Sequence, residues 1–117
     1  MLFRSTSLLV LVQVNVAREA QKSGCQPEEV QRLVERVGGL PRLRLAGLMT
    51  MAPLTDDERV QRGVFAALRS LRDRLEESSG LRLPDLSMGM SGDYPAAVAE
   101  GATILRLGTV LFGERPI

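Results

Sequence analysis

The stretch Leu8-Leu-Val-Leu-Val-Gln-Val-Asn-Val16 decides the fold class of this chain. It is rich in β-branched residues and almost continuously apolar, which is typical of a parallel strand covered on both faces. The run is too short to span a membrane, and Gln13 and Asn15 interrupt it before any small-residue cleavage site. The sequence therefore predicts a buried strand at residues 8–16 and not a signal peptide.

Helices and strands are expected to alternate along the rest of the chain. Three further strands are predicted at residues 43–51, 83–90 and 104–107. Apolar residues at helical spacing lie between them: Val30, Leu33, Val34 and Val37, and then Val60, Val64, Leu68, Leu71 and Leu75. A short helix is expected at residues 94–100, closed by Gly101.

The ends of the two longer helices have recognisable signals. Pro27 opens the first helix, and Gly38-Gly39 stops it. Thr55 and Glu58 have the spacing of a capping box for the second helix, which is expected to end before Gly80.

The resulting order is β-α-β-α-β-α-β, with no hairpin signal. Such alternation implies an α/β fold with right-handed crossovers and a parallel sheet. An open doubly wound sheet and part of a closed TIM-type barrel both fit this pattern. A complete barrel needs roughly 250 residues, so residues 1–117 would form a single domain equivalent to about half of one. Ligands bind beyond the carboxyl ends of the strands in both architectures.

Two segments near such strand ends suggest an anion site: Ser87-Met-Gly-Met-Ser-Gly-Asp93 and Arg106-Leu-Gly-Thr109. Their glycines let a ligand approach the main chain, and Ser91 and Thr109 add hydroxyl donors. Together with Arg106 they would form a phosphate cup. The alternative is two ordinary glycine-containing turns.

Arg106 is the only obligatory charge in these segments. If Leu105 and Leu107 pack on helices, the alternation of a strand directs Arg106 toward the opposite face, near the mouth of the barrel. A ligand is one acceptor for its guanidinium. The alternatives are solvent and an ion pair with Glu100 or Glu114.

The amino-acid composition excludes several classes of function. The net charge is +1, with no Trp, one Tyr and three Phe, so neither a basic footprint nor a stacking platform for nucleic acid is present. The absence of His excludes Ser-His and Cys-His nucleophile systems. The single Cys25 fits a reducing, cytoplasmic compartment and is expected to be a packed small residue more often than a nucleophile.

The chain resembles the pyridoxal phosphate homeostasis family, which has the barrel of the alanine racemase N-terminal domain. The resemblance rests on Leu86-Ser-Met-Gly-Met-Ser-Gly-Asp93, Arg106-Leu-Gly-Thr109 and Phe112-Gly-Glu-Arg115, and on the earlier Val12-Gln-Val-Asn-Val16, Lys22-Ser-Gly24 and Gly47-Leu-Met-Thr50. These segments occur in the same order as in the family, and together they span nearly the whole chain.

This resemblance implies that pyridoxal 5′-phosphate binds at the barrel mouth, without catalytic turnover. By the family pattern, Ser91 and the turn at Gly108 and Thr109 would hold the phosphate, and Arg106 would approach the pyridine nitrogen. A guanidinium there weakens the ring as an electron sink, which suits a carrier. Met49 and Met90 would add apolar wall.

The chain resembles only the second half of the family's barrel. The family's Schiff-base lysine lies in the missing first half, and Lys22 aligns with a different family lysine. Two alternatives therefore remain: half of a racemase-like or decarboxylase-like enzyme, and an oligomerising half-barrel that has no ligand. Open sheet edges at residues 8–16 and 103–109 favour self-association.

Overall fold

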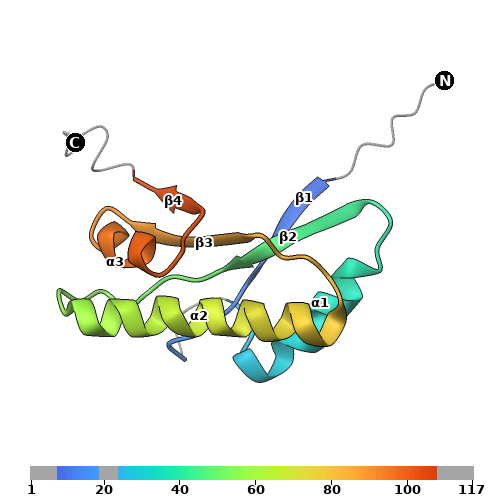
Figure 1. Ribbon diagram of the computed structural model, residues 1–117, viewed down its shortest axis with the longest axis horizontal. Helices are drawn as coiled ribbons and strands as arrows, with labels where there is room; N and C mark the ends of the chain where they lie inside the picture. Colours follow the sequence, from blue (N-terminus) through green and yellow to red (C-terminus); the bar gives the residue numbers. More distant parts are fainter. Residues whose placement is uncertain (1–7, 19–23, 108–117) are drawn as a thin grey trace.

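The computed structural model describes residues 8–18 and 24–107. In chain order, its elements are β1 (Leu8–Gln13), the 3-10 turn η1 (Pro27–Glu29), α1 (Val30–Gly38), β2 (Leu43–Met49), α2 (Glu58–Ser79), β3 (Asp85–Met90), α3 (Tyr94–Ala99) and β4 (Ile104–Arg106). The four strands form one parallel sheet in the order β1-β2-β3-β4 (Figure 1). The predicted parallel α/β fold is confirmed.

The hydrophobic core lies between the sheet and its helices. Phe65 and Leu68 of α2 are fully buried, as are Leu48 of β2 and Leu86 and Met88 of β3. Figure 1 shows α1 and α2 lying along the same face of the sheet, with α3 beside β3 and β4. The strand residues that alternate with the buried ones consequently face away from these helices.

The strands are shorter than the sequence predicts. β1 ends at Gln13 and not at residue 16, because Val14 already forms an isolated bridge with Cys25 and the chain turns at residues 16 and 17. β3 begins at Asp85 and not at residue 83, since Pro84 has no N–H to donate to a ladder. β2 and β4 also end one or two residues early, at Met49 and Arg106.

The predicted capping box at Thr55 and Glu58 is wrong. Asp57 is the N-cap of α2, and its carboxylate accepts a 2.9 Å hydrogen bond from the Arg59 N–H. Thr55 instead accepts the Asp57 N–H at 3.1 Å. Both residue types cap helices well, so spacing alone did not discriminate between them. α2 has 22 residues, and no helix in the described part of the chain is long and apolar enough to cross a membrane.

The buried stripe of α2 is displaced by one residue at its start. Val60, expected in the stripe, is exposed, whereas Gln61 is only 6% exposed. Gln61 precedes Val64 by three positions and Leu68 by seven, which is the helical repeat of the buried face. A polar side chain therefore occupies the first core position of this helix.

Two glycines permit close approaches that no other residue allows. A Cβ at Gly47 would lie 1.7 Å from the carbonyl oxygen of Asp85 on the neighbouring strand. Gly89 has a φ of +109°, and a Cβ there would lie 2.6 Å from the Ala97 Cβ. The β3–β4 register is irregular at this point, between Ser87 and Met90. The sharp exit from β3 thus depends on a glycine, as the sequence motif suggested.

Replacement of Thr50 by valine is expected to lower the free energy of unfolding by about 1–3 kcal/mol. The Thr50 hydroxyl is fully buried and donates a 2.7 Å hydrogen bond to the Val14 carbonyl, which valine cannot make. Urea denaturation measures the change. Thr55→Val is the control, because the Thr55 hydroxyl lies in an exposed interaction. A loss for Thr50→Val that is no larger than for this control would contradict the prediction.

Candidate functional site

A cavity of about 920 Å³ opens at the carboxyl end of the sheet. Its lining comes from residues 51–56 after β2, Gln61 of α2, Met90 at the end of β3 with residues 91–93 after it, and Arg106 at the end of β4. Loops that follow parallel strands are where ligands bind in folds of this kind. The cavity is therefore the candidate site that the position of the sequence motifs indicates.

Three of the six predicted site residues meet in this cavity: Met90, Ser91 and Arg106. Met49 does not line it. Met49 is the last residue of β2 and lies opposite Ser87, inside the sheet. Met51, in the loop that follows β2, lines the cavity instead. Gly108 and Thr109 lie outside the described residues, so their part in the cup stays a prediction.

Arg106 lies on the strand face that alternation predicts. Leu105 packs against the hydrophobic core, and Arg106, the next residue, pairs with Met90 in the β3–β4 register and lines the cavity. Within residues 8–18 and 24–107, no carboxylate forms an ion pair with Arg106. Arg106 thus places a guanidinium, the side chain suited to binding an anion, at the cavity wall.

The predicted alternative of an Arg106–Glu100 pair is wrong. The buried Glu100 carboxylate binds Arg62 at 2.9 Å and Arg69 at 3.1 Å, both of which are on α2. These pairs hold the end of α3 against α2 and leave Glu100 engaged away from the cavity. The other alternative, Glu114, lies outside the described residues.

The turn after β3 is closed by its own aspartate. Asp93 accepts the Met90 N–H at 2.7 Å through its carboxylate, and its own N–H donates to the Met90 carbonyl at 3.2 Å. The charge of Asp93 therefore stabilises the turn that carries Ser91 and Gly92. This arrangement fixes the position of the hydroxyl residue relative to Arg106.

Gln61 is a site residue that sequence reasoning missed. Its side-chain amide donates to the Thr55 carbonyl at 2.9 Å and, at a longer 3.4 Å, to the Gly92 carbonyl. It thereby connects the loop after β2 with the turn after β3. The sequence contained one signal for this role: Gln61 has the helical spacing of the apolar residues on the buried face of α2. A buried side-chain amide is unfavourable unless it forms hydrogen bonds, so partners for Gln61 could have been expected.

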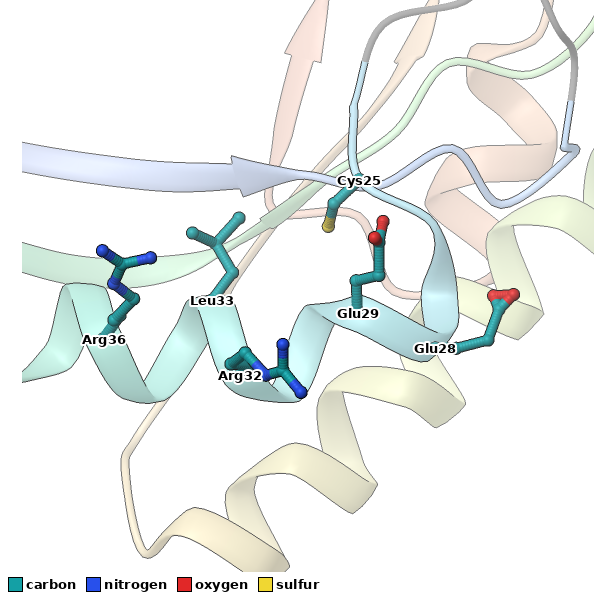
Figure 2. A pocket seen from close by; sticks show the side chains of 6 residues that line it. All are labelled: Cys25, Glu28, Glu29, Arg32, Leu33 and Arg36. Carbon is teal, nitrogen blue, oxygen red and sulfur yellow. The ribbon is translucent and has the colours of Figure 1, made fainter.

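A second cavity, of about 340 Å³, lies beside α1 and is lined by both acidic and basic residues around Cys25 and Leu33. Figure 2 shows Cys25, Glu29 and Leu33 directed into the space between the helical segment and the strand that runs beside it. Cys25 packs against the hydrophobic core, and burial raises the pKa of its thiol. A raised pKa disfavours the nucleophilic thiolate, and the packing of Cys25 against the core agrees with its interpretation as a packed small residue.

Comparison with known proteins agrees with the predicted resemblance. Residues 4–116 match the family model described as "Alanine racemase, N-terminal domain". The chain is 47% identical over 106 residues to the "Pyridoxal phosphate homeostasis protein" of Aquifex aeolicus, which covers 91% of this chain and 46% of that protein. It is 51% identical over 108 residues to the protein of the same name from Pseudomonas aeruginosa, covering 92% and 45%.

Solved structures give the same result. PipY of Synechococcus elongatus, in a structure with PLP bound, superposes with a TM-score of 0.81 at 36% identity, over 92% of this chain and 50% of PipY. The structure of PipY without PLP has a TM-score of 0.85 at 38% identity, with the same coverage. Alanine racemase from Corynebacterium glutamicum is 18% identical with a TM-score of 0.70, which shows a shared fold alone.

The chain spans about half the length of the curated relatives it matches. Its four parallel strands are accordingly part of a TIM-type barrel, as the family resemblance implied, and not an open doubly wound sheet, which the alternation of elements also allowed. The resemblance to pyridoxal phosphate homeostasis proteins is confirmed by several relatives of that name at 39–51% identity. The chain belongs to the alanine racemase N-terminal domain family.

Proposed function

We propose that this chain binds pyridoxal 5′-phosphate in the cavity at the carboxyl end of its sheet and takes part in intracellular homeostasis of that cofactor without catalysing a reaction. The observation that carries the proposal is the meeting of Ser91 and Arg106 in one cavity, because Ser91 directly follows β3 and Arg106 pairs with Met90 at the end of β4. The proposal also draws on the high identity to proteins named for pyridoxal phosphate homeostasis.

The residues present fit the chemistry of the cofactor. Arg106 supplies a cation with no ion-pair partner in the described part of the chain, and Ser91 supplies a hydroxyl beside it. Met90, Met51 and Pro53 give apolar wall for a pyridine ring. One oxygen of the Asp93 carboxylate accepts the Met90 N–H, which ties this side chain to the turn that carries Ser91.

In this proposal, Ser91 and the turn at Gly108 and Thr109 bind the phosphate, and Arg106 approaches the pyridine nitrogen. The cofactor supplies an electron-withdrawing ring when bound, and a guanidinium beside the ring nitrogen keeps that nitrogen unprotonated. We further infer that residues 1–117 act as one domain equivalent to the second half of the barrel, in the cytoplasm.

The test is a titration of the purified chain with pyridoxal phosphate, followed by absorbance and equilibrium dialysis. Arg106→Leu and Thr109→Val are each expected to weaken binding about tenfold or more, because hydrogen bonds to charged groups contribute roughly 1.5–3 kcal/mol. Inorganic phosphate should compete. Arg36→Leu is the matched control, since it removes the same charge from α1, away from the cavity.

Binding is expected to be mostly non-covalent, because no lysine lines the described cavity. Borohydride reduction should therefore trap little adduct, at Lys22 or at the N-terminal amine. Equal affinities for Arg106→Leu and the Arg36→Leu control would refute the site. Stoichiometric trapping at Lys22 would instead support the racemase-like enzyme half.

A further inference from the structure

A buried glutamine connects α2 with the turn that follows β3. Gln61 is only 6% exposed and lies near the start of α2, in helical phase with the buried Val64. Its side-chain amide donates to the Thr55 carbonyl at 2.9 Å and to the Gly92 carbonyl at 3.4 Å. A side chain of the helical core thus reaches the residue that directly follows Ser91.

The buried face of α2 does not need a polar side chain at this position. Removing an amide from water costs free energy that its hydrogen bonds return only in part. An apolar residue of similar length would continue the buried stripe that Val64, Phe65 and Leu68 form. What glutamine adds at position 61 is therefore a pair of directed bonds to two loops of the cavity wall.

The Thr55 end of this connection belongs to a segment that α2 already holds. The Thr55 hydroxyl accepts the Asp57 N–H at 3.1 Å, and the Asp57 carboxylate caps the helix by accepting the Arg59 N–H at 2.9 Å. These bonds fix the Thr55 carbonyl relative to the start of the helix. The bond from Gln61 to that carbonyl consequently fixes the direction of the Gln61 amide.

The bond to Gly92 restrains the turn after β3 from outside. The Asp93 carboxylate and N–H bond the Met90 N–H and carbonyl at 2.7 and 3.2 Å, and so give the turn its shape. These two bonds connect the turn only to the end of its own strand. The bond from Gln61 comes from α2, which packs against α3 and β3 on the side of the molecule where β3 ends (Figure 1).

We propose that Gln61 is a positioning residue for phosphate recognition, acting through the turn at residues 91–93 and not by binding phosphate itself. Its amide nitrogen donates to two carbonyls of the protein, whereas Ser91 of the restrained turn supplies the hydroxyl. Binding groups are effective when a supporting shell of hydrogen bonds holds them in place. This inference rests on the proposed function, in which Ser91 binds the phosphate, and it assigns part of that affinity to a core residue of α2.

Gln61→Met tests this role. Methionine is unbranched and favourable in a helix, and it continues the apolar stripe of α2, but it has no N–H to donate. The affinities for pyridoxal phosphate and for inorganic phosphate should each fall about three- to tenfold, the range expected for one lost hydrogen bond. The affinity for pyridoxal, which has no phosphate group, should stay unchanged. Equilibrium dialysis measures the two pyridoxal ligands, and competition measures inorganic phosphate.

Gln31→Met is the matched control. Gln31 is an exposed glutamine near the start of α1, and its amide donates to the Glu35 carboxylate at 3.2 Å within the same helix. The same chemical change there should leave all three affinities at the wild-type value. Gln61→Glu is a second variant, because a carboxylate has nearly the same shape but opposes the two carbonyls with oxygen atoms. Its affinity for pyridoxal phosphate should fall below that of Gln61→Met.

Amide hydrogen exchange tests the restraint in the absence of ligand. The Met90 and Asp93 N–H groups close the turn, so both should exchange faster in Gln61→Met than in the wild-type chain or in Gln31→Met. The Val14 N–H, which donates to the Met49 carbonyl at 2.8 Å between β1 and β2, should exchange at the wild-type rate. This comparison separates a local change in the turn from a general loss of stability.

The outcomes distinguish a failure of this inference from a failure of the proposed function. If the wild-type chain binds pyridoxal phosphate, and Gln61→Met binds it as tightly as Gln31→Met does, the inference is overturned and the proposed function stands. Equal losses for pyridoxal phosphate and pyridoxal overturn it as well, because they show a general effect on the cavity. Loss of the folded state in both Gln61 variants, seen by circular dichroism, shows a structural role and also overturns it. A wild-type chain that binds neither pyridoxal phosphate nor inorganic phosphate refutes the proposed function, and this inference with it.

Discussion

Gly47→Ala is expected to destabilise the folded protein strongly. The added methyl group would lie 1.7 Å from the Asp85 carbonyl oxygen, and the overlapping atom belongs to backbone, which cannot rotate away. β2 and β3 pair only through residues 47–49 and 85–87, so moving the strands apart breaks their whole ladder. The expected loss exceeds about 3 kcal/mol, the upper end of ordinary overpacking. Circular dichroism and urea denaturation measure it.

Gly63→Ala is the matched control for this substitution. Gly63 lies within α2, and a Cβ there meets nothing within 4 Å. Alanine favours a helix interior over glycine by roughly 1 kcal/mol, so the same chemical change should raise the unfolding midpoint. Equal effects of the two substitutions would show that the close contact between β2 and β3 is absent in solution.

Phe65→Ala is expected to lower the free energy of unfolding by about 3–5 kcal/mol. Phe65 is fully buried and projects from α2 into the core beneath the sheet, where the lost ring leaves a cavity. Such a loss is a large share of the roughly 5–15 kcal/mol that stabilises a typical domain. Denaturant titration of Phe65→Leu, which keeps most of the volume, should show a clearly smaller loss. A smaller loss for alanine than for leucine would contradict this account.

The alternation of elements could be predicted from the sequence because it rests on patterns that act locally. β-branched runs such as the one that starts at Leu8 favour strands, and the spacing of Val64, Leu68 and Leu71 favours a helix. The element ends were less predictable, because they depend on tertiary contacts. β1 stops early since Cys25, eleven residues further along, pairs with Val14 at the strand's open edge.

The candidate site was partly predictable for the same reason. The motifs around Ser91 and Arg106 mark the carboxyl ends of β3 and β4, and parallel strands bring such ends together. The contribution of Gln61 was not predictable, because its two carbonyl partners come from loops whose paths follow from the complete packing. Met49 is likewise absent from the cavity wall because it lies within the sheet, opposite Ser87, and not in the loop that follows β2.

The strand order has a consequence for the kinetics of folding. The paired residues Gln13 and Met49 are separated by 36 positions, and Met49 and Ser87 by 38, whereas Ser87 and Ile104 are separated by only 17. Each doubling of a loop adds about 0.6 kcal/mol of closure entropy, so the β3–α3–β4 unit closes most easily. The nucleus of folding is accordingly placed at the C-terminal β3–α3–β4 unit.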